Sequence, residues 1–234
     1  FNYNINSNSN SNTNLEFIHI PKNAGTSIEN AAKKAGVNWG FKQWTKPGAL
    51  KHGFNLFKMP GEWINSKYNV KYISKDNSRN TCFPWHEIPD NMPDKIYGKN
   101  VKTFCVVRDP YSKIVSAYKY WRGKTATKTD LNYFIQTRLA NFDKNVENMR
   151  WNSGHILPQH MYTHGKRKCD YIIRFENLDT EFSDLMKKFN ITDIKLEKNN
   201  KSAKTVTVAD LDKTSRELIK KAYKRDFELF NYPM

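Results

Sequence analysis

The 234-residue sequence predicts an α/β fold with a mainly parallel central sheet and helices on both of its faces. Short apolar runs of strand length alternate along the chain with segments whose apolar residues recur at helical spacing. Two of these strands end in polar loops that lead directly into helices, and parallel sheets bind their ligands at such strand ends. The length fills one core well and is short for two, so we expect a single domain.

The N-terminal stretch differs in composition from the rest of the chain. Residues 1–14 alternate Asn with Ser, Thr and a few apolar side chains. Such a segment cannot bury enough apolar surface to offset the entropy lost when it becomes ordered. We therefore predict a disordered leader over residues 1–14 and a folded domain over residues 15–234.

The first loop follows an apolar strand that Pro21 ends, because proline has no N–H for the strand ladder. Gly25 lets the backbone approach a ligand closely, and Thr26 or Ser27 is placed to cap a helix that begins near Thr26. Free N–H groups at a helix start, two hydroxyls and the Lys22 ammonium would converge on one anion. The loop therefore predicts a phosphate or sulfate site. It is not a Walker loop, whose lysine follows the last glycine.

The region between the two loops has weaker patterns. Residues 39–63 are rich in Gly, Lys and aromatic side chains without clear periodicity, which suggests irregular structure over the ligand face. The alternation of Tyr68, Val70 and Tyr72 predicts a strand. Residues 76–100 hold three prolines and are expected to form a long loop, of a kind that is often functional.

The second loop follows another buried strand and begins at Arg108. Asp109 is placed to cap the next helix, and Pro110 occupies its first position. Ser112 and Ser116 lie four residues apart and therefore share one face of that helix. Arg108 and a serine hydroxyl can together clasp a second phosphate.

Further apolar segments continue the alternation of strands and helices. A basic loop over residues 197–209 separates the last two of them. In order, the predicted elements are a strand at 101–107, helices at 110–120 and 131–139, a strand at 171–175, a helix at 182–189 and a closing helix at 211–227.

The charge and the cysteines limit the possible partners. Lys and Arg outnumber Asp and Glu by 39 to 23, a formal net charge of +16, which favours anionic partners without choosing among them. Cys82, Cys105 and Cys169 are widely spaced and indicate neither a zinc site nor a disulfide-rich scaffold. A bridge between Cys82 and Cys169 is conceivable in an oxidising compartment. The sequence has no run of about 18 apolar residues, so no membrane span is expected.

At its two loops the chain resembles the sulfotransferases that use 3′-phosphoadenosine 5′-phosphosulfate (PAPS), especially their Golgi carbohydrate branch. The family's 5′-phosphosulfate loop is similar to the run His19-Ile20-Pro21-Lys22-Asn23-Ala24-Gly25-Thr26-Ser27. Its 3′-phosphate motif is similar to Val107-Arg108-Asp109-Pro110 with Ser116. The order and spacing of these motifs also fit one P-loop-like domain. Weaker similarities extend the likeness over residues 15–234.

The resemblance implies which residues hold PAPS and its product PAP. The 5′-phosphosulfate would be held by Lys22, Asn23, Ala24, Gly25, Thr26 and Ser27, the 3′-phosphate by Arg108 and Ser116, and a closing loop would contribute Lys201 and Ser202. Ala24 stands where the family often has glycine, which is a mild departure if its φ angle stays below zero. The family's reaction requires no metal.

The family's reaction is in-line transfer of a sulfuryl group to a hydroxyl or amine, so a base must take the acceptor's proton. Lys22 would stabilise the charge that grows on the leaving oxygen. We predict His86 as the base, because it lies in a Pro-bounded aromatic loop where related sequences carry a similar Trp-His. His52, His155 and Gln159 are predicted to contact the acceptor, and the resemblance favours a glycan in that role.

Three other histidines have simpler interpretations. His19 lies in the first strand and is expected to support packing or the loop rather than catalysis. His160 and His164 have helical spacing, but the sequence places no third ligand near them. We therefore do not expect them to hold a metal.

Two other functions stay open at this point. A nucleotide kinase or another phosphoryl-transfer enzyme shares the fold, but its magnesium ligands and Walker lysine are not visible. A basic nucleic-acid-binding protein agrees with the charge but leaves both loops unexplained, so we expect no nucleic acid partner. The compartment is also open: the Golgi lumen if an upstream anchor has been removed, and the cytoplasm otherwise.

Overall fold

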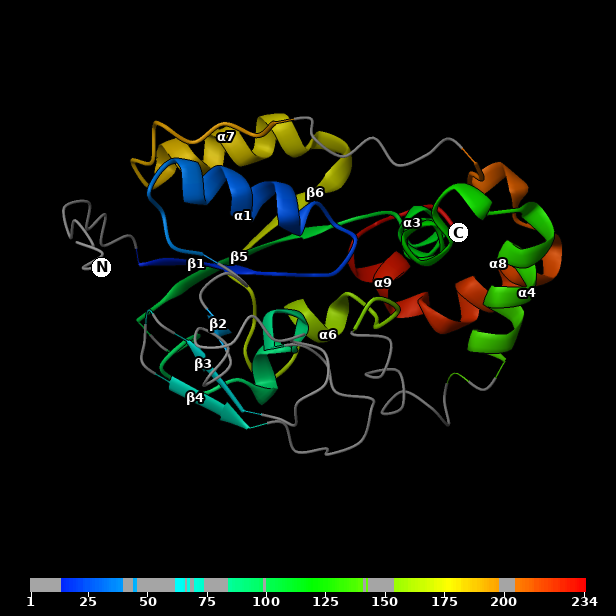
Figure 1. Ribbon diagram of the computed structural model, residues 1–234, viewed down its shortest axis with the longest axis horizontal. Helices are drawn as coiled ribbons and strands as arrows, with labels where there is room; N and C mark the ends of the chain where they lie inside the picture. Colours follow the sequence, from blue (N-terminus) through cyan, green and yellow to red (C-terminus); the bar gives the residue numbers. More distant parts are fainter. Residues whose placement is uncertain are drawn as a thin grey trace, which may run out of the picture.

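The computed structural model shows a central parallel sheet (Figure 1). The residues it describes are 14–39, 44–45, 62–65, 67, 70–73, 84–98, 100–140, 142, 154–197 and 205–234. Strand β5 (Lys102–Val107) lies between β1 (Leu15–Ile18) and β6 (Tyr171–Arg174), and it pairs with both in parallel. Because the three strands run the same way, the loops that follow them lie at one edge of the sheet. The predicted α/β fold is confirmed.

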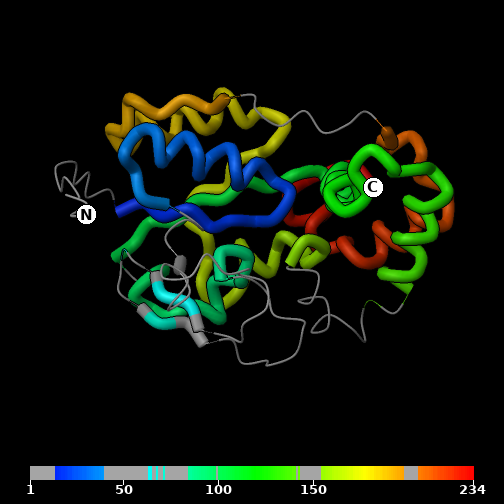
Figure 2. The backbone as a smooth tube through the Cα atoms, viewed as in Figure 1, coloured from blue at the N-terminus to red at the C-terminus, as the bar shows by residue number. Residues whose placement is uncertain are grey.

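Helices cover both faces of this sheet, and Figures 1 and 2 show one pair of helices side by side above it. That pair is α1 (Gly25–Lys34) and α7 (Leu178–Lys188). The helices that form the core of the opposite side are α3 (Pro110–Arg122), α4 (Lys128–Leu139), α6 (His160–Thr163), α8 (Lys213–Ala222) and α9 (Lys224–Leu229). Within the described ranges, no helix has the length and apolarity needed to cross a membrane.

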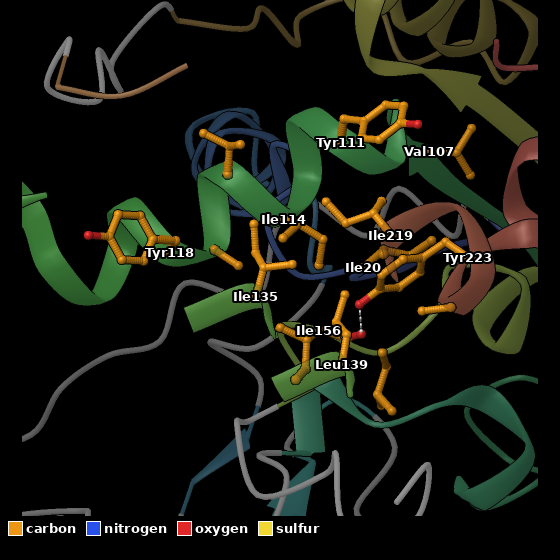
Figure 3. Packing of buried hydrophobic residues seen from close by; sticks show 14 of the residues in the cluster. Ile20, Val107, Tyr111, Ile114, Tyr118, Ile135, Leu139, Ile156, Ile219 and Tyr223 are labelled. Carbon is orange, nitrogen blue, oxygen red and sulfur yellow. Dashed lines mark hydrogen bonds between the residues drawn. The ribbon is translucent and has the colours of Figure 1, made fainter. Parts of the chain in front are cut away.

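The side chains of β5 alternate between the two cores, as expected of a strand buried on both faces. Phe104 and Val106 belong to the core beneath α1 and α7, and Cys105 and Val107 belong to the core on the opposite face. Figure 3 shows part of this second core, where helices from the middle and the end of the chain meet.

The predicted closing helix over residues 211–227 is wrong in one respect, because it consists of two helices, α8 and α9. Tyr223 lies between them with φ −113° and ψ 22°, outside the helical range. Its buried phenol donates a hydrogen bond of 2.5 Å to the carbonyl of Ile156, drawn as a dashed line in Figure 3. The break lets Ile219 of α8 and Phe227 of α9 both reach the same core.

A second, smaller sheet is antiparallel and consists of β2 (Trp44–Thr45), β3 (Glu62–Asn65) and β4 (Val70–Ile73). The strand predicted at Val70 and Tyr72 is confirmed as β4. The expectation of purely irregular structure over residues 39–63 is wrong, since β2 and part of β3 fall within it. Trp63 of β3 packs on Met92 and Ile96, and this long-range contact is not visible in the local sequence pattern.

The two predicted helix starts had different outcomes. Asp109 caps α3 as predicted: its side chain accepts the N–H of Ser112 at 2.8 Å, with Pro110 in the first turn. The expectation that Thr26 or Ser27 caps α1 is wrong. The cap residue is Ala24, which has no side chain that could accept a hydrogen bond.

Candidate functional site

The first loop joins β1 to α1, and its backbone has an unusual shape. Lys22 and Ala24 have φ angles of 71° and 65°, in the left-handed region that costs energy for residues with a Cβ. We expected alanine in place of the family's glycine to matter little if the φ angle of Ala24 stayed below zero. Its φ angle is positive, so this condition is not met. The Ala24 carbonyl accepts the N–H of Ser27 at 2.9 Å and of Ile28 at 3.1 Å. In the described part of the chain, no side chain caps the start of α1, which makes it a suitable place for an anion.

The His19 side chain packs against this loop and supports it, as predicted. Its ring is buried, and its Nδ1 lies 2.6 Å from a carboxylate oxygen of Glu29 on α1. A Cβ built on Gly25 would lie 2.3 Å from His19 Nε2, so the ring packs directly against the first residue of the helix. Only glycine allows this approach, which explains the residue at position 25.

The second loop leaves β5 and places Arg108 at the same edge of the sheet. The carbon at the centre of the Arg108 guanidinium lies 4.1 Å from the centre of the Phe175 ring. Burial lowers the pKa of Arg108. Its Nε is buried and has no hydrogen-bond partner among the residues that the structure describes. Ser116 lies partly buried on α3, in the same motif.

Several hydrogen bonds fix the two loops to each other. Arg108 Nη1 donates to the Lys22 carbonyl at 3.3 Å. The Asn23 amide donates to the Val106 carbonyl at 2.8 Å and to Gln159 Oε1 at 2.6 Å. Gln159 in turn accepts the N–H of Arg108 and donates to its carbonyl, both at 2.8 Å. A ligand that binds one loop therefore binds in a fixed position relative to the other.

Asn23 and Gln159 lie inside this link rather than on an open surface. Both are buried, with exposures of 1% and 0%. The backbone N–H of Gln159 also donates to Asp226 Oδ2 at 2.7 Å, which fixes the start of α6. We predicted Asn23 for the cofactor and Gln159 for the acceptor, and the structure assigns the side chains of both to joining the loops.

Lys22 lies at the centre of the site and is half-buried. Its ammonium nitrogen is 4.2 Å from the centre of the Tyr120 ring. Burial first, and then the nearby Arg108 guanidinium, lower the pKa of Lys22 from 10.5 to about 8. No carboxylate among the described residues forms an ion pair with it. Two cations brought together in this way favour an anion between them.

His86 lies in the short 3₁₀-helix Pro84–His86 and is buried. Its ring packs edge-on against His19, with 4.7 Å between ring centres, and against His155 at 5.1 Å. Its carbonyl accepts the phenol of Tyr162 at 2.8 Å, which holds the segment in place. The imidazoles of His19, His86 and His155 thus form a row, and His19, at one end of it, packs against Gly25 of the first loop.

His155 ends this row close to Lys22. Its ring stacks on Tyr120 at 4.9 Å with 20° between the planes, and it also contacts Trp121 at 5.3 Å. The fold therefore connects Lys22 to His155 through Tyr120, and His155 to His86, from distant parts of the sequence. His52, Lys201 and Ser202 lie outside the described residues, as does Cys82.

Lys113 is a buried residue that our sequence reasoning missed. It has no exposed surface, and its ammonium donates to the carbonyls of His155 at 3.0 Å and Leu157 at 2.9 Å. Burial lowers its pKa to about 8. It holds the segment that carries His155 against α3. The position was detectable, because Lys113 lies one helical turn before the buried Ala117.

The remaining histidines have structural partners. His160 Nδ1 lies 2.7 Å from Asp226 Oδ1, and His164 Nδ1 lies 2.8 Å from the Thr163 hydroxyl. Across the described ranges, no group of three or more His, Cys, Asp or Glu side chains is arranged to hold a metal ion. Cys105 and Cys169 are both free thiols.

Comparison with known proteins adds a finding that is independent of this geometry. The model of the sulfotransferase family matches residues 7–233, which is nearly the whole chain. No curated protein and no solved structure gives a match.

Proposed function

Since the chain belongs to the sulfotransferase family and is a sulfotransferase enzyme, we propose that it transfers a sulfuryl group from PAPS. We propose further that the acceptor is a hydroxyl, or an amine, of a glycan. The observation that carries this proposal is the link between the two loops. They follow β1 and β5, and Arg108 Nη1 lies 3.3 Å from the Lys22 carbonyl. A nucleotide with a phosphate at each end of its ribose requires two anion sites held at a fixed separation.

The residues present fit such a ligand. Lys22 and Arg108 are adjacent cations, and the Arg108 Nε is buried without a partner in the described part of the chain. The start of α1 has no side-chain cap. Buried donors and unpaired cations are stabilised when an anion accepts their hydrogen bonds. We assign Lys22, Gly25, Thr26 and Ser27 to the 5′-phosphosulfate.

The second loop fits the 3′-phosphate. Phe175 fixes the Arg108 guanidinium at 4.1 Å, and the fork of an arginine matches phosphate geometry. Ser116 lies on the helix that this loop begins and offers a hydroxyl. The hydrogen bonds of Asn23 and Gln159 keep the two loops in register and so preserve the spacing of the two anion sites.

Bound PAPS would supply an activated sulfuryl group whose leaving group is a phosphate oxygen. Lys22 and the N–H groups at the start of α1 would stabilise the negative charge that develops on that oxygen. This task requires the protonated ammonium, and a pKa of about 8 keeps Lys22 largely protonated at pH 7. The protein's contribution is therefore placement and charge rather than a covalent intermediate.

We assign His86 as the general base that takes the acceptor's proton. It belongs to neither loop, but its ring touches His19, which packs against Gly25. These contacts support an imidazole base near the first loop that is not itself one of the proposed phosphate-binding residues. His155, at the other end of the row, contacts Tyr120 near Lys22 and is the alternative base.

A binding experiment tests the donor. We expect PAP to raise the melting temperature without any divalent metal, because a ligand that binds only the native state stabilises it by mass action. ADP lacks the 3′-phosphate and should have a much smaller effect. Equal shifts with PAP and ADP would contradict the assignment of Arg108 and Ser116.

A transfer experiment tests the acceptor. Sulfate transfer from labelled PAPS would be measured on an unsulfated hexasaccharide of alternating hexuronic acid and N-acetylhexosamine, on a tyrosine-containing peptide and on hexanol. We expect the hexasaccharide to be the best acceptor. Faster transfer to the peptide or to hexanol would overturn the glycan assignment while leaving the PAPS assignment intact.

A further inference from the structure

The end of α3 exposes two large aromatic side chains in succession. Tyr120 is 62% exposed and Trp121 is 39% exposed. Helix α3 ends directly after them, where Gly123 adopts a φ angle of 56°. Exposed aromatic residues that lie next to each other often mark a binding surface rather than packing. We call Tyr120 and Trp121 the aromatic pair.

The aromatic pair is continuous with the site of transfer. The Lys22 ammonium lies 4.2 Å from the centre of the Tyr120 ring, so the residue that faces the leaving group touches this surface. The His155 ring stacks on Tyr120 with 4.9 Å between ring centres, and Trp121 and His155 make a T-shaped contact with 5.3 Å between ring centres. A group bound on the pair therefore lies next to Tyr120, the residue that the Lys22 ammonium contacts.

Neighbouring side chains hold the aromatic pair in place. Trp121 packs against Phe134 of α4, with 5.4 Å between the ring centres. Lys113, buried in α3, holds the carbonyl of His155 at 3.0 Å. These contacts hold the two rings in place before a ligand arrives, which reduces the entropy lost on binding.

We propose that Tyr120 and Trp121, whose rings meet at 69° with 6.4 Å between their centres, form the acceptor subsite: the C–H face of a pyranose ring stacks on Trp121, while one hydroxyl of the sugar lies beside Tyr120 and points toward Lys22. An aromatic ring carries negative potential on its face, which suits the slightly positive C–H groups of a sugar. Rigid aromatic side chains also give a large contact area at a low cost in conformational entropy. This inference rests on the sulfuryl transfer proposed above and adds the residues that receive the acceptor.

The two rings have different roles in this subsite. Tyr120 contacts Lys22, so Tyr120→Ala should lower kcat as well as raise the acceptor KM. Trp121 contacts His155 but has no contact with Lys22 among those the structure shows, so Trp121→Ala should raise the acceptor KM and leave kcat close to wild type. We expect a rise of about 5- to 30-fold in KM, the usual effect of removing an aromatic anchor.

Tyr133 offers a matched control. It is an aromatic residue on α4 with 69% exposure, and it belongs to neither core cluster. Tyr133→Ala should leave both KM and kcat unchanged. If Trp121→Ala has no more effect on KM than Tyr133→Ala, the subsite assignment is wrong.

A second pair of variants separates stacking from folding, because Trp121→Ala could weaken the packing against Phe134. Trp121→Phe keeps a ring face, and Trp121→Leu keeps apolar bulk without one. We expect the phenylalanine variant to stay within about threefold of the wild-type KM and the leucine variant to resemble alanine. Equal KM values for the two variants would overturn stacking as the mode of binding.

Binding measured without turnover completes the test. Calorimetry of the PAP-loaded protein with the unsulfated hexasaccharide should show binding that Trp121→Leu weakens and Tyr133→Ala does not, and sorbitol, an acyclic polyol, should not bind measurably. Binding of this kind without any sulfate transfer would support the subsite and contradict the proposed function. Transfer that is indifferent to Trp121 would contradict the subsite alone.

Discussion

The two phosphate loops occupy equivalent places, after β1 and β5, but the helices that follow them begin in opposite ways. The second loop is completed by its own residues: Asp109 accepts the N–H of Ser112 at 2.8 Å, and Pro110 has no N–H to satisfy. The first loop has Ala24 as its cap residue, with a φ angle of 65° and no side-chain hydrogen bond. The start of α3 thus has a side-chain cap for its backbone N–H groups, and the start of α1 has none.

This difference indicates that the two loops have different roles in binding and transfer. The second loop keeps its shape without a ligand and is suited to anchoring one. The first loop holds Lys22 and Ala24 in a costly conformation and leaves N–H groups without caps, and such strain is typical of sites where a ligand completes the structure. We therefore expect changes in the first loop to affect turnover and changes in the second to affect affinity.

The largest expected effect comes from His86, which lies outside both loops. His86→Ala should lower kcat by about 10²- to 10⁴-fold, the usual contribution of a positioned base, with PAP affinity close to wild type. The measurement is steady-state kinetics on the best acceptor, together with PAP binding by calorimetry.

His155→Ala and His52→Ala are the controls for this assignment. If His86→Ala keeps most of its activity while one of these variants is folded, binds PAP and is inactive, the base is that other histidine. Tyr162→Phe removes the phenol that holds the His86 carbonyl at 2.8 Å and should have a smaller effect than His86→Ala.

The comparison of the loops becomes sharper when Lys22→Ala and Arg108→Ala are measured together. Lys22→Ala should lower kcat by about 10²- to 10³-fold, because its charge matters most when the leaving oxygen becomes negative. Arg108→Ala should weaken PAP binding by about 10- to 100-fold, as expected for charged hydrogen bonds, and should leave ADP binding nearly unchanged. A kcat unaffected by Lys22→Ala would make Lys22 a residue for binding alone.

The pH dependence should also distinguish the loops. The pKa of Lys22 is lowered from 10.5 to about 8, so its ammonium is present below pH 8 and lost above it. kcat/KM for PAPS should therefore fall about tenfold per pH unit above pH 8, because this parameter reports the free enzyme. In Lys22→Arg the decline near pH 8 should disappear, since arginine stays charged. A decline that persists in Lys22→Arg would have another origin.

The same shift has a consequence for stability. Between pH 8 and 10.5 the unfolded chain keeps the Lys22 proton that the folded chain releases, so the stability of the ligand-free protein should rise with pH in this window. Burial also lowers the pKa of Lys67 and of Lys113 to about 8, so both lysines add to the rise. Chemical denaturation at pH 7.5 and 9.5, for wild type and Lys22→Arg, would separate the contribution of Lys22 from that of the other two lysines.

The sequence predicted those parts of the fold and of the site that depend on local pattern. The apolar run of β5 and the Asp109-Pro110 helix start follow from burial and capping rules that act within a few residues. The open cap at Ala24 was missed, because the neighbouring hydroxyls of Thr26 and Ser27 offered a locally better one. In that loop the requirement of the site overrides local preference.

Contacts between distant segments could not be predicted from local pattern. Gln159 joins both loops from 51 residues beyond Arg108 and 136 beyond Asn23, and nothing in its own neighbourhood indicates this. The row of His19, His86 and His155 likewise forms only when the chain folds. Such pairings depend on topology, which periodicity does not encode.

The smallest expected effect concerns the two helix caps themselves, measured as the free energy of unfolding. Asp109→Ala should destabilise the protein by about 1 kcal/mol, because it removes the acceptor of the Ser112 N–H. Ala24→Gly should stabilise it by about 0.5–1 kcal/mol, since glycine adopts a φ angle of 65° without the clash of a Cβ. Neither change removes a charge from the site, so PAP binding by Ala24→Gly should stay near wild type. A destabilising Ala24→Gly would show that the backbone of the first loop is not strained, and the contrast between an open and a closed helix start would then rest on capping alone.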